Sequence, residues 1–168
     1  MILTKTEILK EIKSKRIKIT PFKNLNLGPA SYDLTLADEF RVFKKNVDFF
    51  EVTNEADFHR VTKKITAKNY MLMPGEMILG ITREKISIPE DMCGWLQGRS
   101  RFARVGLTVH ITASFMQPGI NNKQVLEIFN AGPIPLKLCV GTKVCQLIFQ
   151  RCEGKAKYKG RFHKQIKP

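Results

Sequence analysis

Glu127 is the residue of this 168-residue chain with the clearest potential for chemistry, because it is a carboxylate among apolar residues in a basic neighbourhood. It lies in the segment QVLEIFN, and the only other acid after Asp91 is Glu153. Strand alternation places Glu127 on one face with Val125 and Phe129. Apolar flanks partly remove a carboxylate from water, which suits it to proton transfer. A structural ion pair with a nearby arginine is the alternative interpretation, and both can hold at once.

The segment Gly98–Arg104, with the sequence GRSRFAR, has the composition of an anion-binding turn. Its glycine permits a tight exit from the preceding apolar run, and Ser100 is a good N-cap for a short helix. With Arg99 and Arg101, such a helix start offers backbone N–H groups, a hydroxyl and guanidinium groups to an anion. Arg104 falls on the same helical face as Ser100. A solvated basic turn is the alternative, and these seven residues alone do not decide between the two.

The histidine and cysteine residues do not form a recognisable metal site. His110 is a lone histidine in an expected strand, which favours a packed side chain over a catalytic role. The cysteines form no C-x-x-C pair, and no histidine lies at zinc-finger spacing. Three of them lie among apolar residues and are expected to be small core residues: Cys93, Cys139 and Cys145. Trp95 and the pair Phe49–Phe50 are also expected in the core.

Net charge is the unusual feature of the composition. The chain has 29 Lys and Arg against 15 Asp and Glu, a formal net charge of +14, and most of the excess lies in residues 1–28 and 151–168. Such a surface favours a polyanionic partner. Phosphate-loop, dinucleotide-binding and zinc-deaminase signatures are absent. There is no apolar stretch of membrane-spanning length, and the first residues lack signal-peptide features, so we expect a cytoplasmic protein.

The elements that must position these residues are almost all β-strands. One helix is expected from Thr4, with a Thr4–Glu7 capping box, and its pattern fades at Ser14. Ten short β-rich runs follow: Arg16–Ile19, Ser31–Leu36, Phe40–Phe43, Tyr70–Met73, Met77–Thr82, Gly94–Leu96, Thr108–Thr112, Gln124–Phe129, Leu136–Leu138 and Val144–Phe149. The sequence therefore predicts one mainly β domain, a sandwich or barrel, over residues 1–150. Residues 151–168 are expected to form a basic tail that is ordered only on contact.

A set of motifs, in order along nearly the whole chain, resembles the dCTP deaminases of the dCTP deaminase/dUTP diphosphatase superfamily. The match is less certain at about residues 44–69. The motifs are Met1-Ile2-Leu3, Ile19-Thr20-Pro21-Phe22, Pro29-Ala30-Ser31-Tyr32-Asp33-Leu34, Pro74-Gly75-Glu76, Gly98-Arg99-Ser100, Ala103-Arg104, Gly106-Leu107, Val109-His110-Ile111-Thr112-Ala113, Pro118-Gly119, Leu126-Glu127, Asn130, Gln146-Leu147 and Ala156-Lys157-Tyr158. As a set these motifs are highly specific.

The resemblance implies a distorted β-barrel or jelly-roll-like fold of the dUTPase type, a homotrimer with shared active sites, and zinc-free deamination at cytosine C4. Glu127 would be the general base and acid. Ser100 and Arg104 of a neighbouring subunit would support the water and the charge of the site, and the Ala113 backbone would hold the water. The nucleotide would be bound by Arg99, Ser100, Arg101, Arg104, Gln117, Val125, Leu126, Lys157 and Arg161. Magnesium would be carried by the triphosphate.

Three positions depart from the family pattern: Gln117 replaces an aspartate, Arg101 a serine, and Arg161 a glutamine of the tail. In the diphosphatase branch the aspartate orients the hydrolytic water, so a neutral amide favours a deaminase that releases dUTP and ammonia. A dUTP diphosphatase and a bifunctional enzyme that converts dCTP to dUMP remain alternatives. A non-catalytic nucleotide- or nucleic-acid-binding protein would also explain the basic ends, although no recognition motif supports nucleic-acid binding.

Overall fold

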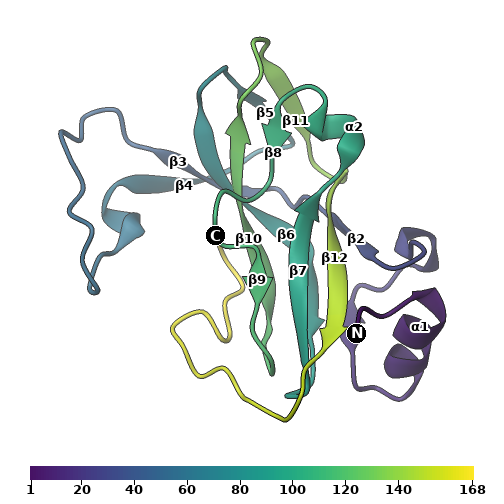
Figure 1. Cartoon of the computed structure of the whole chain (residues 1–168). Helices are drawn as coiled ribbons and strands as arrows, with labels where there is room; N and C mark the ends of the chain where they lie inside the picture. The colour runs from purple at the N-terminus through teal and green to yellow at the C-terminus, as the bar shows by residue number, and fades with distance from the viewer.

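Antiparallel strands make up most of the regular structure in the computed structural model, which describes residues 1–168 (Figure 1). The helices are α1 (Lys5–Lys13) and α2 (Ser100–Ala103), with two 3-10 turns, η1 (Asn24–Asn26) and η2 (Phe58–Arg60). The strands are β1 (Lys18–Thr20), β2 (Tyr32–Thr35), β3 (Glu39–Phe43), β4 (Thr62–Thr66), β5 (Asn69–Leu72), β6 (Met77–Ser87), β7 (Met92–Gly98), β8 (Leu107–Thr108), β9 (Phe115–Met116), β10 (Asn121–Asn130), β11 (Leu136–Cys139) and β12 (Lys143–Arg151).

Two larger sheets enclose one core. The first has the order β4-β3-β6-β10-β8, with β1 also paired to β6, and the second has the order β2-β12-β7-β9. A short β5-β11 pair completes the fold. The core contains apolar side chains of both sheets, among them Ile78 and Leu126 of the first and Leu96 and Leu147 of the second. The prediction of a mainly β, jelly-roll-like fold with a short N-terminal helix is confirmed, and the sheets remain open at their edges.

Helix α1 lies where the apolar spacing places it and ends before Ser14. Thr4 is its N-cap, but its side chain makes no capping hydrogen bond, so the expected capping box is wrong. The reason is that the Glu7 carboxylate pairs with Arg151 at 3.2 Å and Lys10 at 3.7 Å instead of returning to the helix start.

The expected strand over residues 108–112 ends at Thr108, and a loop follows. The backbone N–H groups of Ile111 and Thr112 donate to the Glu127 carboxylate, so they do not enter the strand ladder. Strands β4 and β9 have no counterpart among the ten expected runs. Sequence reasoning missed β4 because two consecutive lysines, Lys63 and Lys64, interrupt its apolar pattern, and β9 because it has only two residues.

Three apolar positions expected in the core are exposed instead. Phe49 is 80% exposed in the long connection between β3 and β4, Phe50 is 37% exposed there, and Trp95 is 37% exposed on β7, where its ring contacts that of Phe115 in a tilted arrangement. Cys139 is also exposed, because it ends the short strand β11, whereas Cys93 and Cys145 are buried as expected. Hydrophobicity alone did not separate core residues from those on sheet edges and loops.

The C-terminal tail returns along β10, the strand that carries Glu127, and Figure 1 shows it passing beside β9 and β10. The Tyr158 N–H donates to the Pro118 carbonyl at 2.9 Å, and the Lys123 N–H donates to the Gln165 carbonyl at 2.9 Å. The Tyr158 ring is half-buried against the core. The tail therefore makes backbone hydrogen bonds to its own chain, beside the strand that carries Glu127. Neither α-helix has the length and apolarity that crossing a membrane requires.

Candidate active site

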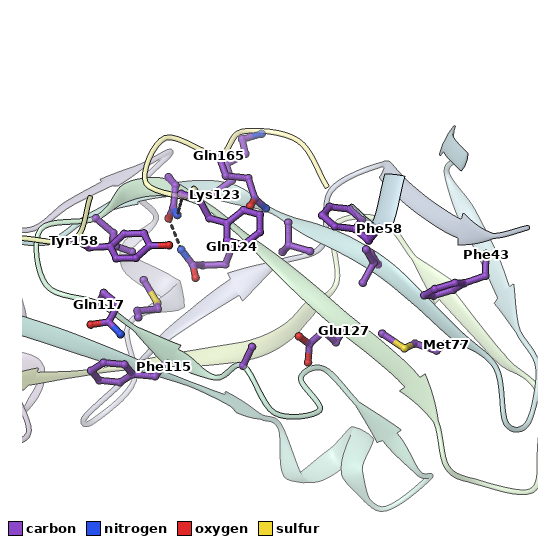
Figure 2. A pocket seen from close by; sticks show the side chains of 17 residues that line it. Phe43, Phe58, Met77, Phe115, Gln117, Lys123, Gln124, Glu127, Tyr158 and Gln165 are labelled. Atoms are coloured by element: carbon purple, nitrogen blue, oxygen red, sulfur yellow. Dashed lines mark hydrogen bonds between the residues drawn. The ribbon is translucent and has the colours of Figure 1, made fainter. Parts of the chain in front are cut away.

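A cavity of about 530 Å³ opens between β10, β6, the β9 segment and the C-terminal tail. Figure 2 shows it in close view, with Glu127 between Phe115 on one side and Met77 on the other. Of the predicted site residues, four line this cavity: Ala113, Gln117, Val125 and Glu127. Glu127 is the only carboxylate among the lining residues. The structure thus brings the predicted proton-transfer group and part of the predicted substrate site together.

The strand β10 presents Glu127 to the cavity by simple alternation. Leu126 and Ile128 point into the core and are completely or almost completely buried, while Glu127 is half-buried on the other face. The cross-strand partner of Glu127 in β6 is Leu79. The Glu127 carboxylate therefore projects from the paired strands β10 and β6, and the side chain next to it on β6 is the apolar Leu79. The sequence had predicted apolar surroundings for Glu127.

The loop after β8 holds one oxygen of the Glu127 carboxylate. Its Oε2 accepts hydrogen bonds from the Ile111 N–H at 2.7 Å and the Thr112 N–H at 3.2 Å. Oε1 has no protein hydrogen-bond partner, and no ion pair involves Glu127. The alternative of a structural ion pair is therefore not supported within one chain. A carboxylate with one oxygen fixed and one free is oriented for proton exchange.

His110 precedes these two loop amides, in the loop rather than in the expected strand. Its ring is half-buried, its Nδ1 is buried without a hydrogen-bond partner, and it does not line the cavity. The adjacent Val109 is buried and anchors the loop to the core. The loop thus acts on Glu127 through its backbone.

The segment Gly98–Arg104 forms the short helix α2 away from the lining of this cavity. Its N-cap is Arg99 rather than Ser100, which is the first helical residue, so the expected cap is wrong by one position. Ser100 is exposed, as are Arg101 and Arg104, and no ion pair or side-chain hydrogen bond involves either arginine. One chain alone does not bring this segment to Glu127.

Arg99 differs from the other two arginines because it is held by the protein. Its guanidinium contacts the Asp33 carboxylate at 3.2 Å and donates to the Lys143 carbonyl at 3.1 Å. Lys143 lies 3.9 Å from the same carboxylate. Asp33, on β2, therefore orients the predicted phosphate-binding residue Arg99.

The remaining predicted substrate residues do not line the cavity with their side chains. Leu126 is fully buried, so only its backbone is available to a ligand. Lys157 pairs with Glu90 at 3.4 Å, and Arg161 pairs with Asp57 at 3.3 Å. Both are on the tail, close to residues that do line the cavity.

Sequence reasoning missed the aromatic and aliphatic wall of the cavity. This wall is formed by apolar side chains from β3, η2, β6, β9 and the tail: Phe43, Phe58, Met77, Leu79, Phe115, Tyr158 and Phe162. Met77 and Leu79 are two positions apart on one strand, so alternation alone places them on one face. The other members come from segments far apart in the sequence, and no local pattern connects them.

No cluster of three or more His, Cys, Asp or Glu side chains that could hold a metal ion is present. The single carboxylate of the cavity is a poor donor set for a protein-bound divalent cation, which takes several oxygen ligands.

Comparison with known proteins points to one family. The profile of the "dCTP deaminase-like" family matches residues 2–152. A protein of Persephonella marina named "dCTP deaminase, dUMP-forming" is 32% identical over 169 residues, covering 98% of this chain and 93% of that protein. A protein of Nocardioides sp. with the same name is 33% identical over 177 residues, covering 100% of this chain and 93% of that protein.

The crystal structure of 2'-deoxycytidine 5'-triphosphate deaminase from Agrobacterium tumefaciens is similar in fold. Its TM-score is 0.70 at 18% identity, and the match covers 89% of this chain and 48% of that chain. This chain therefore spans about half of the length of that chain, and the likeness shows a shared fold.

Proposed function

This chain belongs to the dCTP deaminase-like family, and from that premise we propose that it hydrolyses dCTP at cytosine C4 to release dUTP and ammonia. The observation that carries the proposal is the carboxylate of Glu127. One of its oxygens is fixed by the Ile111 and Thr112 N–H groups, while the other is free at the wall of a cavity. Hydrolytic deamination needs one such group to move protons between water and the substrate.

The proposed reaction uses Glu127 twice. Glu127 accepts a proton from water as the oxygen attacks C4, and delivers that proton to N3 of the ring. The second proton of the water then passes through Glu127 to the amino group. The C4–N4 bond breaks, ammonia leaves, and the ring is left as uracil. The Ala113 backbone, which lines the same cavity, supplies the second hydrogen bond to the water.

We propose that the triphosphate is bound by the Gly98–Arg104 segment of a second copy of the chain. Arg101 and Arg104 are exposed and have no carboxylate partner, which leaves their guanidinium groups available to phosphate oxygens. Arg99 and Ser100 lie beside them, and Lys157 and Arg161 belong to the tail that covers the cavity. The expected assembly is a homotrimer with shared sites, in the cytoplasm, and the magnesium ion would be carried on the phosphates.

A second candidate is the combined conversion of dCTP to dUMP. The names of the relatives in Persephonella and Nocardioides favour it, because both are called dUMP-forming. Gln117 favours dUTP as the product, because it lines the cavity as a neutral amide and cannot serve as the base for pyrophosphate release. We therefore propose dUTP as the main product.

The test is to incubate the protein with dCTP and magnesium and to measure ammonia, dUTP, dUMP and pyrophosphate. We expect Glu127→Gln to lower ammonia release at least about a hundredfold while dCTP binding is retained. Glu153→Gln is the matched control, because Glu153 is exposed in the tail and makes no ion pair. Full activity of Glu127→Gln would remove Glu127 from the mechanism. Stoichiometric pyrophosphate from dCTP would establish the second candidate.

A further inference from the structure

The wall of the cavity contains two aromatic rings from segments that are far apart in the sequence. Phe58 belongs to η2, in the connection between β3 and β4, and Phe162 belongs to the C-terminal tail. Figure 2 shows Phe58 and the tail residue Gln165 on the same side of Glu127. Neither ring is carried by a strand, so no sheet pairing fixes the position of one relative to the other.

Arg161 connects these two segments, because it reaches from the tail to the start of η2. Its Nη1 donates to the Ala56 carbonyl at 3.2 Å, and its Nη2 lies 3.3 Å from Oδ1 of Asp57. Asp57 directly precedes Phe58, and Arg161 directly precedes Phe162. The ion pair thus joins the residues that stand next to the two rings.

Asp57 is itself held in place as the N-cap of η2. Its Oδ1 accepts a hydrogen bond from the His59 N–H at 3.2 Å and lies 2.6 Å from the His59 Nδ1. The hydrogen bond with the His59 ring lowers the pKa of Asp57, so the carboxyl group is charged at neutral pH. The start of η2 therefore presents an oriented carboxylate to Arg161.

Arg161 does not reach the cavity with its own side chain. The side chain is 53% exposed and does not line the cavity, and its guanidinium lies 5.8 Å from the centre of the Phe162 ring. The family profile ends at residue 152, and neither Asp57 nor Arg161 lies in a motif that carries the family resemblance. The contacts of Arg161 are therefore those of a residue that positions the wall.

We propose that Asp57 is a positioning residue of this site, which binds Arg161 and so holds Phe162 of the tail beside Phe58. Arg161 then acts as the partner of Asp57 and not as the phosphate ligand that the resemblance implies. The inference rests on the proposed deamination of dCTP and concerns how the same site holds its substrate. The Asn122 amide also donates to the Phe162 carbonyl, at 2.7 Å, so loss of the ion pair loosens the tail without releasing it.

The first experiment compares the steady-state kinetics of two variants. Asp57→Asn is expected to raise the KM for dCTP about threefold to fivefold with kcat unchanged, since an amide oxygen keeps the cap of η2 but loses the charge. Glu39→Gln is the matched control, because it breaks the 3.0 Å pair with Lys64 on the same hairpin and neither residue lines the cavity. An unchanged or lowered KM in Asp57→Asn would overturn the inference.

Charge reversal separates a positioning role of Arg161 from phosphate binding. Arg161→Glu should raise the KM for dCTP about tenfold, because two carboxylates then face each other. In an Asp57→Lys background the same change should lower KM, because it restores the pair with opposite signs. If Arg161→Glu raises KM in both backgrounds, Arg161 binds phosphate, and this inference is wrong while the proposed function stands.

Limited trypsin digestion tests the contact without a nucleotide. Cleavage of a segment follows how often it opens, so the exposed Lys159 and Lys164 of the tail should be cut about threefold to fivefold faster in Asp57→Asn than in the unmodified protein or Glu39→Gln. Equal rates in all three proteins would contradict the contact. If dCTP is not deaminated but the rates differ as expected, the proposed function fails and the contact between η2 and the tail stands.

Discussion

Two groups of arginines in this protein differ in whether carboxylates hold them. Arg16 contacts Glu11 at 2.7 Å and Asp91 at 2.8 Å, and Arg151 contacts Glu11 at 2.7 Å. These ion pairs connect α1 to β12 and to the residue before β7. Arg101 and Arg104, in the Gly98–Arg104 segment, have no ion-pair partner and are exposed. The first group stabilises the fold, whereas the second group is available to a ligand.

This difference changes what the net charge of +14 means. A basic N-terminal segment alone suggests a surface for polyanions, but Arg16 is already neutralised by two acids of its own chain. Arg101 and Arg104, which have no carboxylate partner, lie in the Gly98–Arg104 segment, where the sequence predicted phosphate binding, but Arg60 and Arg83 are also exposed without an ion pair. Arg99 is intermediate, because Asp33 holds it while a quarter of its side chain remains exposed, 26%. Pairing therefore identifies the cations that hold the fold, whereas the candidate ligand-binding cations are those that are unpaired and also lie in the Gly98–Arg104 segment.

If paired arginines stabilise the fold and the unpaired ones of the Gly98–Arg104 segment bind the ligand, the largest effect on activity is expected for Arg104→Ala. Removing a charged donor from a reacting site lowers the rate by about a hundredfold or more, so kcat/KM for dCTP should fall by that amount. The free energy of unfolding should change by less than about 0.5 kcal/mol, because Arg104 makes no contact that holds the fold. Steady-state kinetics and urea denaturation measure the two effects.

A mixing experiment tests whether Arg104 acts on a neighbouring copy. Glu127→Gln and Arg104→Ala proteins are each expected to be nearly inactive. When the two are unfolded together and refolded, mixed assemblies contain sites with both intact residues, and activity should return. If the mixture stays as inactive as its components, the shared site is excluded.

Glu11→Gln should have the opposite effects to Arg104→Ala: the free energy of unfolding should fall, and activity should not change. Glu11 is only 6% exposed and accepts hydrogen bonds from two arginines, so its loss should lower the free energy of unfolding by about 2 kcal/mol. The kcat/KM for dCTP should be unchanged. Glu7→Gln is the control, because Glu7 pairs with Arg151 at the surface and should cost less than about 1 kcal/mol. Loss of activity in a stable, folded Glu11→Gln protein would contradict the division between the two groups.

Local patterns predicted most of the elements but not the contacts between distant segments. The alternation in QVLEIFN placed Glu127 opposite the buried Leu126 correctly, because strand periodicity is local. The loop that fixes Glu127 was predicted as a strand. The prediction was wrong because the Thr112 N–H donates to the Glu127 carboxylate, fifteen residues away in sequence, and no local pattern indicates that bond. The wall formed by Phe43 and Phe58 also depends on the pairing of β3 with β6, which the sequence of either strand does not specify.

Asp33→Asn is expected to have a smaller and selective effect, because Asp33 acts through Arg99. The KM for dCTP should rise about tenfold with kcat nearly unchanged, since the guanidinium loses its orientation rather than its charge. In an Arg99→Ala background the same change should have no further effect on KM. Asp91→Asn breaks the equivalent pair with Arg16 and should leave KM unchanged. Additive effects of Asp33→Asn and Arg99→Ala would show that Asp33 does not position Arg99.

The smallest predicted effect is the pH dependence that the paired arginines give to stability. Burial of Glu11 raises its pKa, but the hydrogen bonds from Arg16 and Arg151 outweigh that effect, so the pKa is lowered overall. The hydrogen bond from Arg16 also lowers the pKa of Asp91. Carboxyl groups with lowered pKa values contribute stability that is present above their unfolded-state values, about pH 4, and lost as pH falls through the folded-state values.

The expected result is a free energy of unfolding that decreases from pH 5 to pH 3, with a shallower decrease in Glu11→Gln. Arg104→Ala is the control. Its free energy of unfolding should decrease with pH as steeply as that of the unmodified protein, because Arg104 pairs with no carboxyl group. Urea denaturation at stepwise pH values measures both slopes. A slope in Glu11→Gln as steep as in the unmodified protein would mean that the paired arginines do not set the acid stability of the fold.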